Sequence, residues 1–225
     1  MAKSKPIPVL EYIALGDSFT WAFIDIYAAH IERDLGVQVN LHNWSFGGQR
    51  SDELLEMLRE NESLRTLLCK ADVVTFMIPM ARFREPSIAY ITRGDVENQD
   101  GMRAAFALYQ QDAERIFREL LSLRKPSEAI LRVMDCYLPS FLFDEWNRHG
   151  MFQELKSWWE KFNDYVAWLA SERDIPVARV RFAFNGPSGD VNPVEYIGED
   201  GWHVNERGAA LIAKLHCELG YAPLA

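Results

Sequence analysis

Cysteine is scarce in this sequence: Cys69, Cys136 and Cys217 are its only three, and they form no Cys-x-x-Cys pair. Their wide spacing argues against a disulfide framework and against a thiolate metal site. We therefore expect three reduced and mostly buried thiols, as is typical of a cytoplasmic protein.

Long hydrophobic runs are also lacking. The apolar stretch that starts at Val9 is interrupted by Glu11, so we predict neither a signal peptide nor a membrane span, and the cytoplasm is the expected location. Positive charge is in short supply, because 24 Lys and Arg residues stand against 33 Asp and Glu residues, for a net charge of -9. No basic stripe offsets this balance, which argues against nucleic acids and anionic membranes as partners.

Several motifs of cofactor and metal chemistry are missing. The sequence has no Gly-x-x-x-x-Gly-Lys-Ser/Thr, no Gly-x-Gly-x-x-Gly and no His-Glu-x-x-His, so phosphate loops and zinc-protease helices lack support. The histidines other than His203 are scattered without the spacing of metal ligands. We predict no cofactor and no metal, and a flavodoxin-like nucleotide binder is the weakest of the functional hypotheses.

Short apolar segments alternate with segments of helical periodicity along the whole chain. The predicted strands are residues 12–15, 37–41, 72–78, 129–134 and 176–180. The intervening helices make this pattern typical of a parallel sheet covered on both faces, so we predict one doubly wound α/β domain over residues 1–225. Residues 79–100 and 135–147 are predicted to be long irregular segments, which usually carry function or are mobile.

Ser18 lies between the end of the first predicted strand and the start of the first helix. In an open α/β sheet this is the edge that holds ligands, and the helix start leaves backbone N–H groups unpaired there. Taken alone, Ser18 or Asp17 could equally be a helix N-cap, since both residue types are preferred at that position.

The far end of the sequence supplies a carboxylate and an imidazole. Asp200 and His203 are three residues apart just before the last predicted helix, so one tight turn could deliver both to Ser18. Nucleophilic acyl transfer needs a hydroxyl, an imidazole that takes its proton, and a carboxylate that holds the imidazole. His203 could instead be a core histidine or a residue of the helix start.

Three blocks of the sequence resemble those of the SGNH/GDSL hydrolases, which include lipase-like and esterase-like enzymes. The blocks are residues 16–19 (Gly-Asp-Ser-Phe), the loop 43–54, and residues 200–205 (Asp-Gly-Trp-His-Val-Asn). The resemblance implies a flavodoxin-like, five-stranded parallel sheet. It also implies that Ser18 is the nucleophile, His203 the general base and Asp200 the acid that orients it, while the N–H groups of Ser18 and Gly48 bind the oxyanion. Gly48 could also simply be a turn glycine that needs a positive φ.

One block departs from the family pattern. The family has Gly-x-Asn-Asp after the third strand, where the asparagine completes the oxyanion hole, whereas this chain has Pro79-Met80-Ala81-Arg82. Loss of one oxyanion donor costs on the order of a hundred- to a thousandfold in turnover. The substitutes that the sequence offers, without ranking them, are Asn43, Arg82, Arg84 and Asn98.

Two functional hypotheses follow. The first is a serine hydrolase that cleaves a small ester, thioester or O-acylated sugar through an acyl-enzyme on Ser18, its partner being a small acyl ester. The second is a weakened binding protein on the same fold, motivated by the missing asparagine. Aromatic residues of the two long segments could form a pocket wall or merely anchor the loops: Phe83, Tyr90, Tyr137, Phe141, Phe143 and Trp146.

Overall fold

The structure, a computed structural model, describes residues 6–93 and 99–224. At its centre lies a five-stranded sheet in which all paired strands are parallel, with the order β2-β1-β3-β4-β5. The strands are β1 (Val9–Gly16), β2 (Gln38–Ser45), β3 (Val73–Phe76), β4 (Ile130–Met134) and β5 (Val177–Ala178). This is the flavodoxin-like strand order, so the predicted doubly wound α/β fold is confirmed.

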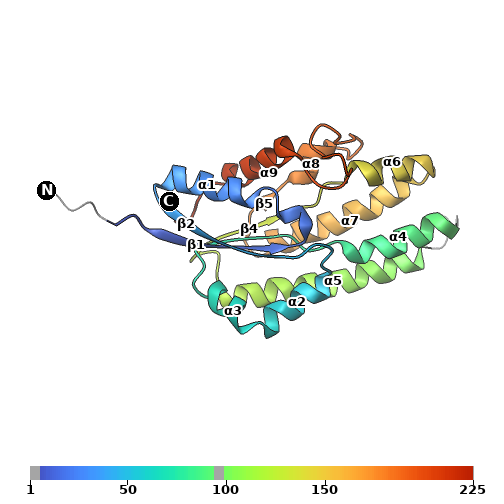
Figure 1. Ribbon diagram of the computed structural model, residues 1–225. Coiled ribbons are helices and arrows are strands. Elements are labelled where there is room, and N and C mark those ends of the chain that lie inside the picture. The colour runs from blue at the N-terminus through green and yellow to red at the C-terminus, as the bar shows by residue number, and fades with distance from the viewer. Residues whose placement is uncertain (1–5, 94–98, 225) are drawn as a thin grey trace.

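Helices cover both faces of the sheet (Figure 1). One face carries α1 (Ile24–Leu35), α8 (Val180–Asn185) and α9 (Glu206–Glu218). The other carries α2 (Ser51–Glu60), α3 (Glu62–Leu68), α5 (Asp100–Leu123) and α7 (Phe152–Ser171). Two further helices, α4 (Ala81–Arg93) and α6 (Ser140–Arg148), extend beyond the sheet at its carboxyl edge.

The strands form where bulky apolar residues run together. Tyr12, Ile13, Ala14 and Leu15 of β1 are all fully buried, as expected for a central parallel strand that is covered on both faces. Helix α1 presents its apolar stripe to the same core and ends at Gly36, whose φ of +66° suits the left-handed position after a helix. In this strand order, β1 is followed along the chain by its neighbour on one side, β2, and then by its neighbour on the other side, β3. The carboxyl end of β1 is therefore the topological switch point, where folds of this type have a crevice.

Both segments that we predicted to be irregular contain a helix, and those two predictions were wrong. Residues 81–93 form α4 although Pro86 lies inside it. Proline removes one helical hydrogen bond, but the helix keeps an apolar side, since Phe83 and Tyr90 are buried. Residues 140–148 form α6, which buries Trp146.

Smaller differences concern ends and side chains. Strand β2 continues to Ser45, so it takes in Asn43 and Trp44, which we had assigned to a loop. The prediction that the thiols are mostly buried was also wrong, because Cys136 is buried but Cys69 is exposed and Cys217 is only half-buried.

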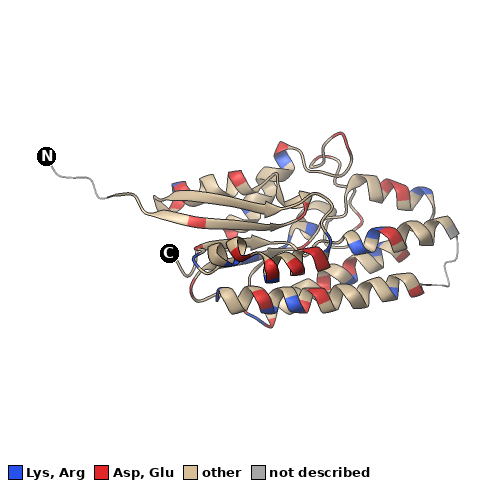
Figure 2. Cartoon of the chain, turned by 60° about the horizontal axis from the view of Figure 1, so that its bottom comes forward, with Lys and Arg blue, Asp and Glu red and all other residues tan. Residues whose placement is uncertain are grey.

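The surface charges, the helices and the possible metal ligands each bear on the sequence predictions. Acidic and basic residues are interleaved along the helices (Figure 2). Among the helices of residues 6–93 and 99–224, none is both long and apolar enough to cross a membrane. Within the same residues, no group of three or more His, Cys, Asp or Glu side chains is placed to hold a metal ion.

Candidate active site

The turn after β1 places Ser18 at the carboxyl edge of the sheet. Gly16 has a φ of +137°, and a Cβ at this position would lie 2.6 Å from Thr20 Oγ1, so only glycine fits. Asp17 then accepts a hydrogen bond from the Phe19 N–H at 3.0 Å and caps the short 3₁₀ turn Ser18–Thr20. Asp17, rather than Ser18, is therefore the capping residue, and the Ser18 hydroxyl is left for another partner.

That partner comes from 185 residues further along the chain. His203 Nε2 lies 2.9 Å from Ser18 Oγ. The other ring nitrogen of His203, Nδ1, lies 2.5 Å from Asp200 Oδ2. The structure thus brings together the three side chains to which the family resemblance assigns the nucleophile, the base and the acid.

The loop that carries Asp200 and His203 is held closed by its own backbone. An isolated antiparallel bridge joins Ile197 to Val204, and the Gly198 N–H donates to the His203 carbonyl at 2.7 Å. The second oxygen of Asp200, Oδ1, accepts from the N–H groups of Trp202 and His203 at 2.8 and 2.9 Å. These bonds fix the orientation of the carboxylate before any substrate arrives.

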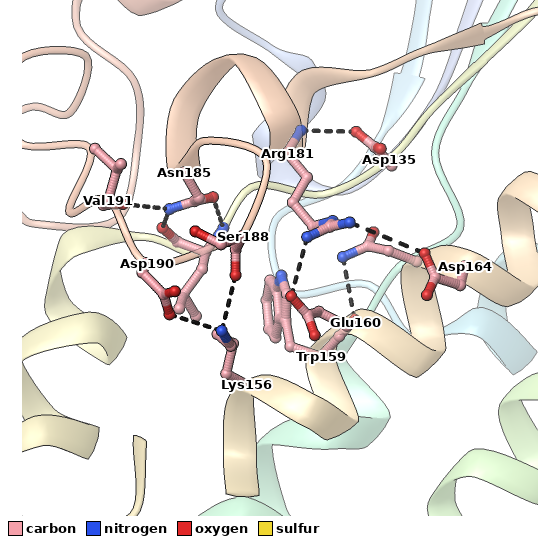
Figure 3. A network of polar contacts seen from close by, with 12 residues as sticks. Asp135, Lys156, Trp159, Glu160, Asp164, Arg181, Asn185, Ser188, Asp190 and Val191 are labelled. Carbon is pink, nitrogen blue, oxygen red and sulfur yellow. Dashed lines mark hydrogen bonds and ion pairs between the residues drawn. The ribbon is translucent and has the colours of Figure 1, made fainter. Parts of the chain in front are cut away.

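The chain on either side of this loop is anchored to the rest of the fold. Asn205 caps α9 by accepting from the Gly208 N–H at 3.0 Å. Upstream, the buried Asn185 side chain bonds both the N–H and the carbonyl of Leu138, and also the carbonyl of Val191 (Figure 3). Lys156 of α7 binds Asp190 at 2.6 Å in the same network. The loop is therefore tied to the segment after β4 and to α7.

Two carboxylates near Ser18 have opposite electrostatics. The hydrogen bond to His203 lowers the pKa of Asp200 to about 2. Burial raises the pKa of Asp17 to about 7, and the hydrogen bond from Phe19 opposes this only in part. Near neutral pH, Asp200 is therefore ionised and able to stabilise an imidazolium, whereas burial disfavours the charged form of Asp17.

Two backbone N–H groups are available for an oxyanion. Among residues 6–93 and 99–224, neither the Ser18 N–H nor the Gly48 N–H has a hydrogen-bond partner. Gly48 has a φ of +72° and nothing within 4 Å of the place where a Cβ would be, so glycine is there for its backbone conformation rather than for space. Both residues line the same groove as His203.

The predicted substitutes for the missing asparagine lie in different places. Arg82 points away to α5, where its Nε lies 2.8 Å from Asp112 Oδ2 and 3.1 Å from Ser51 Oγ. Asn43 lies in β2, where its side-chain oxygen accepts from the Ser45 N–H at 3.0 Å, and it does not line the groove. Asn98 falls outside the described residues. Arg84 is the one member of the set, within the described part of the chain, that lines the groove.

The groove runs from Ser18 between α4 and α6 and has a volume of about 930 Å³. Of the aromatic residues suggested for a pocket wall, Phe83, Phe141 and Trp146 line it, whereas Tyr90, Tyr137 and Phe143 do not. Sequence reasoning missed the lining residues of α4, which include Ser87, Ile88, Ile91 and Thr92. The signal was the helical spacing of the apolar residues Met80, Phe83 and Ile91, which Pro86 obscured.

Comparisons with known proteins show the fold. No protein-family model matches the sequence, and no curated protein matches it. Among solved structures, a lipase from a goat rumen metagenome is 22% identical, with a TM-score of 0.77 over 96% of this chain and 100% of that one.

More distant structures have the same architecture. An acetyl xylan esterase variant from Geobacillus stearothermophilus is 15% identical, with a TM-score of 0.62 over 96% of this chain and 97% of that one. A lipase/acylhydrolase from Enterococcus faecalis is 14% identical, with a TM-score of 0.59 over 95% and 98% of the two chains. The protein therefore has the fold of lipases and esterases, and in particular the SGNH/GDSL-hydrolase fold that the motifs of its sequence predict.

Proposed function

We propose that the protein is a serine hydrolase of carboxylic esters that acts through an acyl-enzyme on Ser18. The observation that carries this proposal is the line of short contacts from Ser18 Oγ through His203 to Asp200, at 2.9 and 2.5 Å. Both distances are within hydrogen-bond reach, which is the geometric requirement for a nucleophile and its base. The esterase and lipase neighbours support the same class of reaction.

In the proposed first half-reaction, His203 Nε2 takes the Ser18 proton while Oγ attacks the ester carbonyl. The developing oxyanion accepts hydrogen bonds from the N–H groups of Ser18 and Gly48. His203 then donates the proton to the leaving alkoxide, the C–O bond breaks, and the acyl group stays on Ser18. Asp200 stabilises the imidazolium between these steps.

In the second half-reaction, water takes the place of the alcohol. His203 accepts a proton from water as the oxygen attacks the acyl carbon, and it returns the proton to Ser18 Oγ as the acid leaves. Asp200 accepts from two backbone N–H groups as well as from the imidazole, so its orientation does not depend on the substrate. Arg84 is the candidate for a third oxyanion donor, because it lines the groove and no ion pair holds its side chain within the described residues.

A fluorophosphonate probe tests the proposal without a guess at the substrate. The intact mass of the wild-type protein should increase by one probe adduct, and Ser18→Ala and His203→Ala should abolish this increase. Ser122→Ala is the matched control, since this serine is exposed at the end of α5 and has only a backbone carbonyl as partner. An adduct that persists in Ser18→Ala would refute the proposed nucleophile.

A binding protein on a hydrolase fold is the second candidate. Two observations favour it. Residues 79–82 contain no side-chain amide that could complete an oxyanion hole, and the Arg82 guanidinium is hydrogen-bonded to Asp112 instead. This candidate predicts no adduct with the probe and no turnover of any ester, while ligand binding survives in Ser18→Ala. A single Ser18-dependent adduct would exclude it.

A further inference from the structure

The groove between α4 and α6 has a length that can be derived from its walls. Helix α4 starts at Ala81, shortly after β3, which pairs with β1, the strand that ends two residues before Ser18. Lining residues follow along this helix as far as Thr92. At a rise of about 1.5 Å per residue, the 11 steps from Ala81 to Thr92 extend about 16 Å from the nucleophile.

The side chains that line the groove are mostly apolar. Its inner wall consists of the buried residues Met80, Phe83, Trp146 and Trp159, and Ile88 lies at its rim with 52% of its surface exposed. Phe141, another lining residue, is 46% exposed, and an apolar ligand that covers Ile88 and Phe141 removes their apolar surface from water, which favours binding. An acetyl group, with three heavy atoms, would leave almost all of this wall uncovered.

Apart from Arg84 and the residues of the candidate active site, the polar side chains that line the groove along α4 and α6 have partners within those helices. Ser87 Oγ donates to the Arg84 carbonyl and Thr92 Oγ1 to the Ile88 carbonyl, each at 2.8 Å within α4. Glu145 is paired with Arg148 at 2.7 Å and with His149 at 3.1 Å. A sugar needs many free donors and acceptors for its hydroxyl groups, and these bonds leave few of them. The aromatic wall therefore suits an alkyl chain better than a polysaccharide.

We infer that the α4–α6 groove binds an unbranched alkyl chain of up to about thirteen carbons, because staggered C–C bonds of about 1.5 Å advance about 1.25 Å each along the chain and about thirteen of them span about 16 Å. This inference rests on the proposed function, because the chain belongs to an ester whose carboxyl carbon lies at Ser18. The substrates are then esters that carry a long alkyl chain on either the acyl or the alcohol side. A volume of about 930 Å³ is at the upper end of the roughly 300–1,000 Å³ of small-molecule sites.

Two series of esters test the inference and locate the chain. In 4-nitrophenyl esters the acyl chain varies from two to twelve carbons, and in alkyl acetates the alcohol chain varies over the same range. Each methylene that the groove covers is worth up to about fourfold in kcat/KM. We expect kcat/KM to rise at least tenfold from two to ten carbons in one of the two series. That series tells whether the acyl or the alcohol part lies in the groove.

Variants that fill the groove provide the link to structure. Ile88→Trp and Thr92→Trp add bulk at exposed positions of the groove, so the fold should tolerate them. Both should reduce kcat/KM for the ten-carbon ester at least tenfold and leave the two-carbon ester within about twofold. Leu108→Trp is the matched control, because Leu108 is 45% exposed on α5 and does not line the groove.

A binding measurement separates this inference from the proposed hydrolysis. Titration calorimetry of Ser18→Ala should give at least tenfold tighter binding of decanoate than of butyrate, and Thr92→Trp should remove the difference. If esters are cleaved in a Ser18-dependent way but neither series rises with chain length, the inference is wrong and the proposed function stands. If nothing is cleaved but decanoate is still preferred, the proposed function is wrong and the groove assignment stands. Equal binding of decanoate and butyrate would overturn the groove assignment.

Discussion

Two aspartates lie on opposite sides of the Ser18–His203 pair, in two regions that are built differently. Asp17 is in the turn after β1, where 5% of its surface is exposed, and burial raises its pKa to about 7. Asp200 is in the loop before α9, where its side chain is half exposed and its hydrogen bond to His203 lowers its pKa to about 2. Both accept hydrogen bonds from backbone N–H groups of residues that follow them.

The difference shows that the surroundings of a carboxylate decide which task it can perform. Solvent and the hydrogen bond from His203 stabilise the charge of Asp200, so its carboxylate can accept a hydrogen bond from the imidazole N–H. The turn that holds Asp17 offers one hydrogen bond and little water, so its charge is costly there. Asp17 therefore shapes the turn, whereas Asp200 acts on His203.

The largest expected effect tests the Asp200 side of the comparison. Asp200→Asn removes the negative charge and favours the wrong tautomer of His203, so kcat should fall by up to about 10⁴-fold. Steady-state hydrolysis of an accepted ester measures this. Glu199→Gln removes an exposed neighbouring charge and should leave kcat within about twofold. An equal fall in kcat in the two variants would mean that the total negative charge of the loop, and not the contact between Asp200 and His203, supports hydrolysis.

The second prediction tests the cost of charge at Asp17. A carboxyl whose folded-state pKa is raised binds protons more tightly when folded, so its contribution to stability is lost as pH rises from about 4 to 7. Asp17→Asn keeps the capping oxygen and removes the charge. Its free energy of unfolding, relative to wild type, should therefore increase by about 3 kcal/mol between pH 5 and pH 8. Urea unfolding at both pH values measures this, and a pH-independent difference would contradict it.

A third prediction extends the comparison to a buried base far from the site. Burial lowers the pKa of His216 to about 3, and neither of its ring nitrogens has a partner within the described residues. Its neutral ring stacks on Phe23 with centroids 4.8 Å apart. A histidine whose folded-state pKa is lowered costs stability as pH falls below the unfolded value of about 6.5.

His216→Phe should remove this sensitivity to acid. The variant should gain about 2 kcal/mol relative to wild type when the pH falls from 8 to 5. Thermal or urea unfolding at the two pH values checks the result. Parallel pH profiles of the two proteins would show that the pKa of His216 is the same in the folded and the unfolded chain, which would contradict the prediction.

The smallest expected effect concerns how the two regions are held together. Tyr137 donates to the Trp202 carbonyl at 2.9 Å, and its ring packs edge-on against Phe19 at 4.9 Å. Tyr137→Phe should cost about 1 kcal/mol of stability. It should also lower kcat a few-fold with little change in KM, because Trp202 precedes the base. Tyr165→Phe, which loses a bond to the exposed Glu114, should change stability slightly and kcat not at all.

Local patterns in the sequence were enough to predict the sheet and the meeting of Ser18 with the Asp200–His203 loop. The strands are short apolar runs, which the sequence shows directly. The motifs at residues 16–19 and 200–205 lie at the end of a strand and at the start of a helix, so the fold fixes their positions. The catalytic roles themselves came from the family resemblance and remain a proposal. The helices α4 and α6 could not be predicted in this way, because Pro86 breaks the helical pattern of the first and the second is only nine residues long.

The electrostatic details were also beyond the sequence. The sequence does not show that the Asp17 carboxylate is buried and the Asp200 carboxylate is not. Burial of Asp17 depends on how Phe19, Tyr137 and the end of β3 pack around the turn. Likewise, Arg82 and Arg84 are two residues apart, but the helix directs the first to Asp112 and leaves the second along the groove. Which arginine can meet a substrate is a property of the packed fold.

The separation of Ser18 and His203 by 185 residues has a consequence for biosynthesis. At translation rates of about 5–20 residues per second, the histidine is made about 10–40 s after the serine. Under the proposed mechanism, Ser18 has no base during this time and is an ordinary alcohol. The proposed reactivity toward acyl donors then arises only when the last helix has docked beside the first.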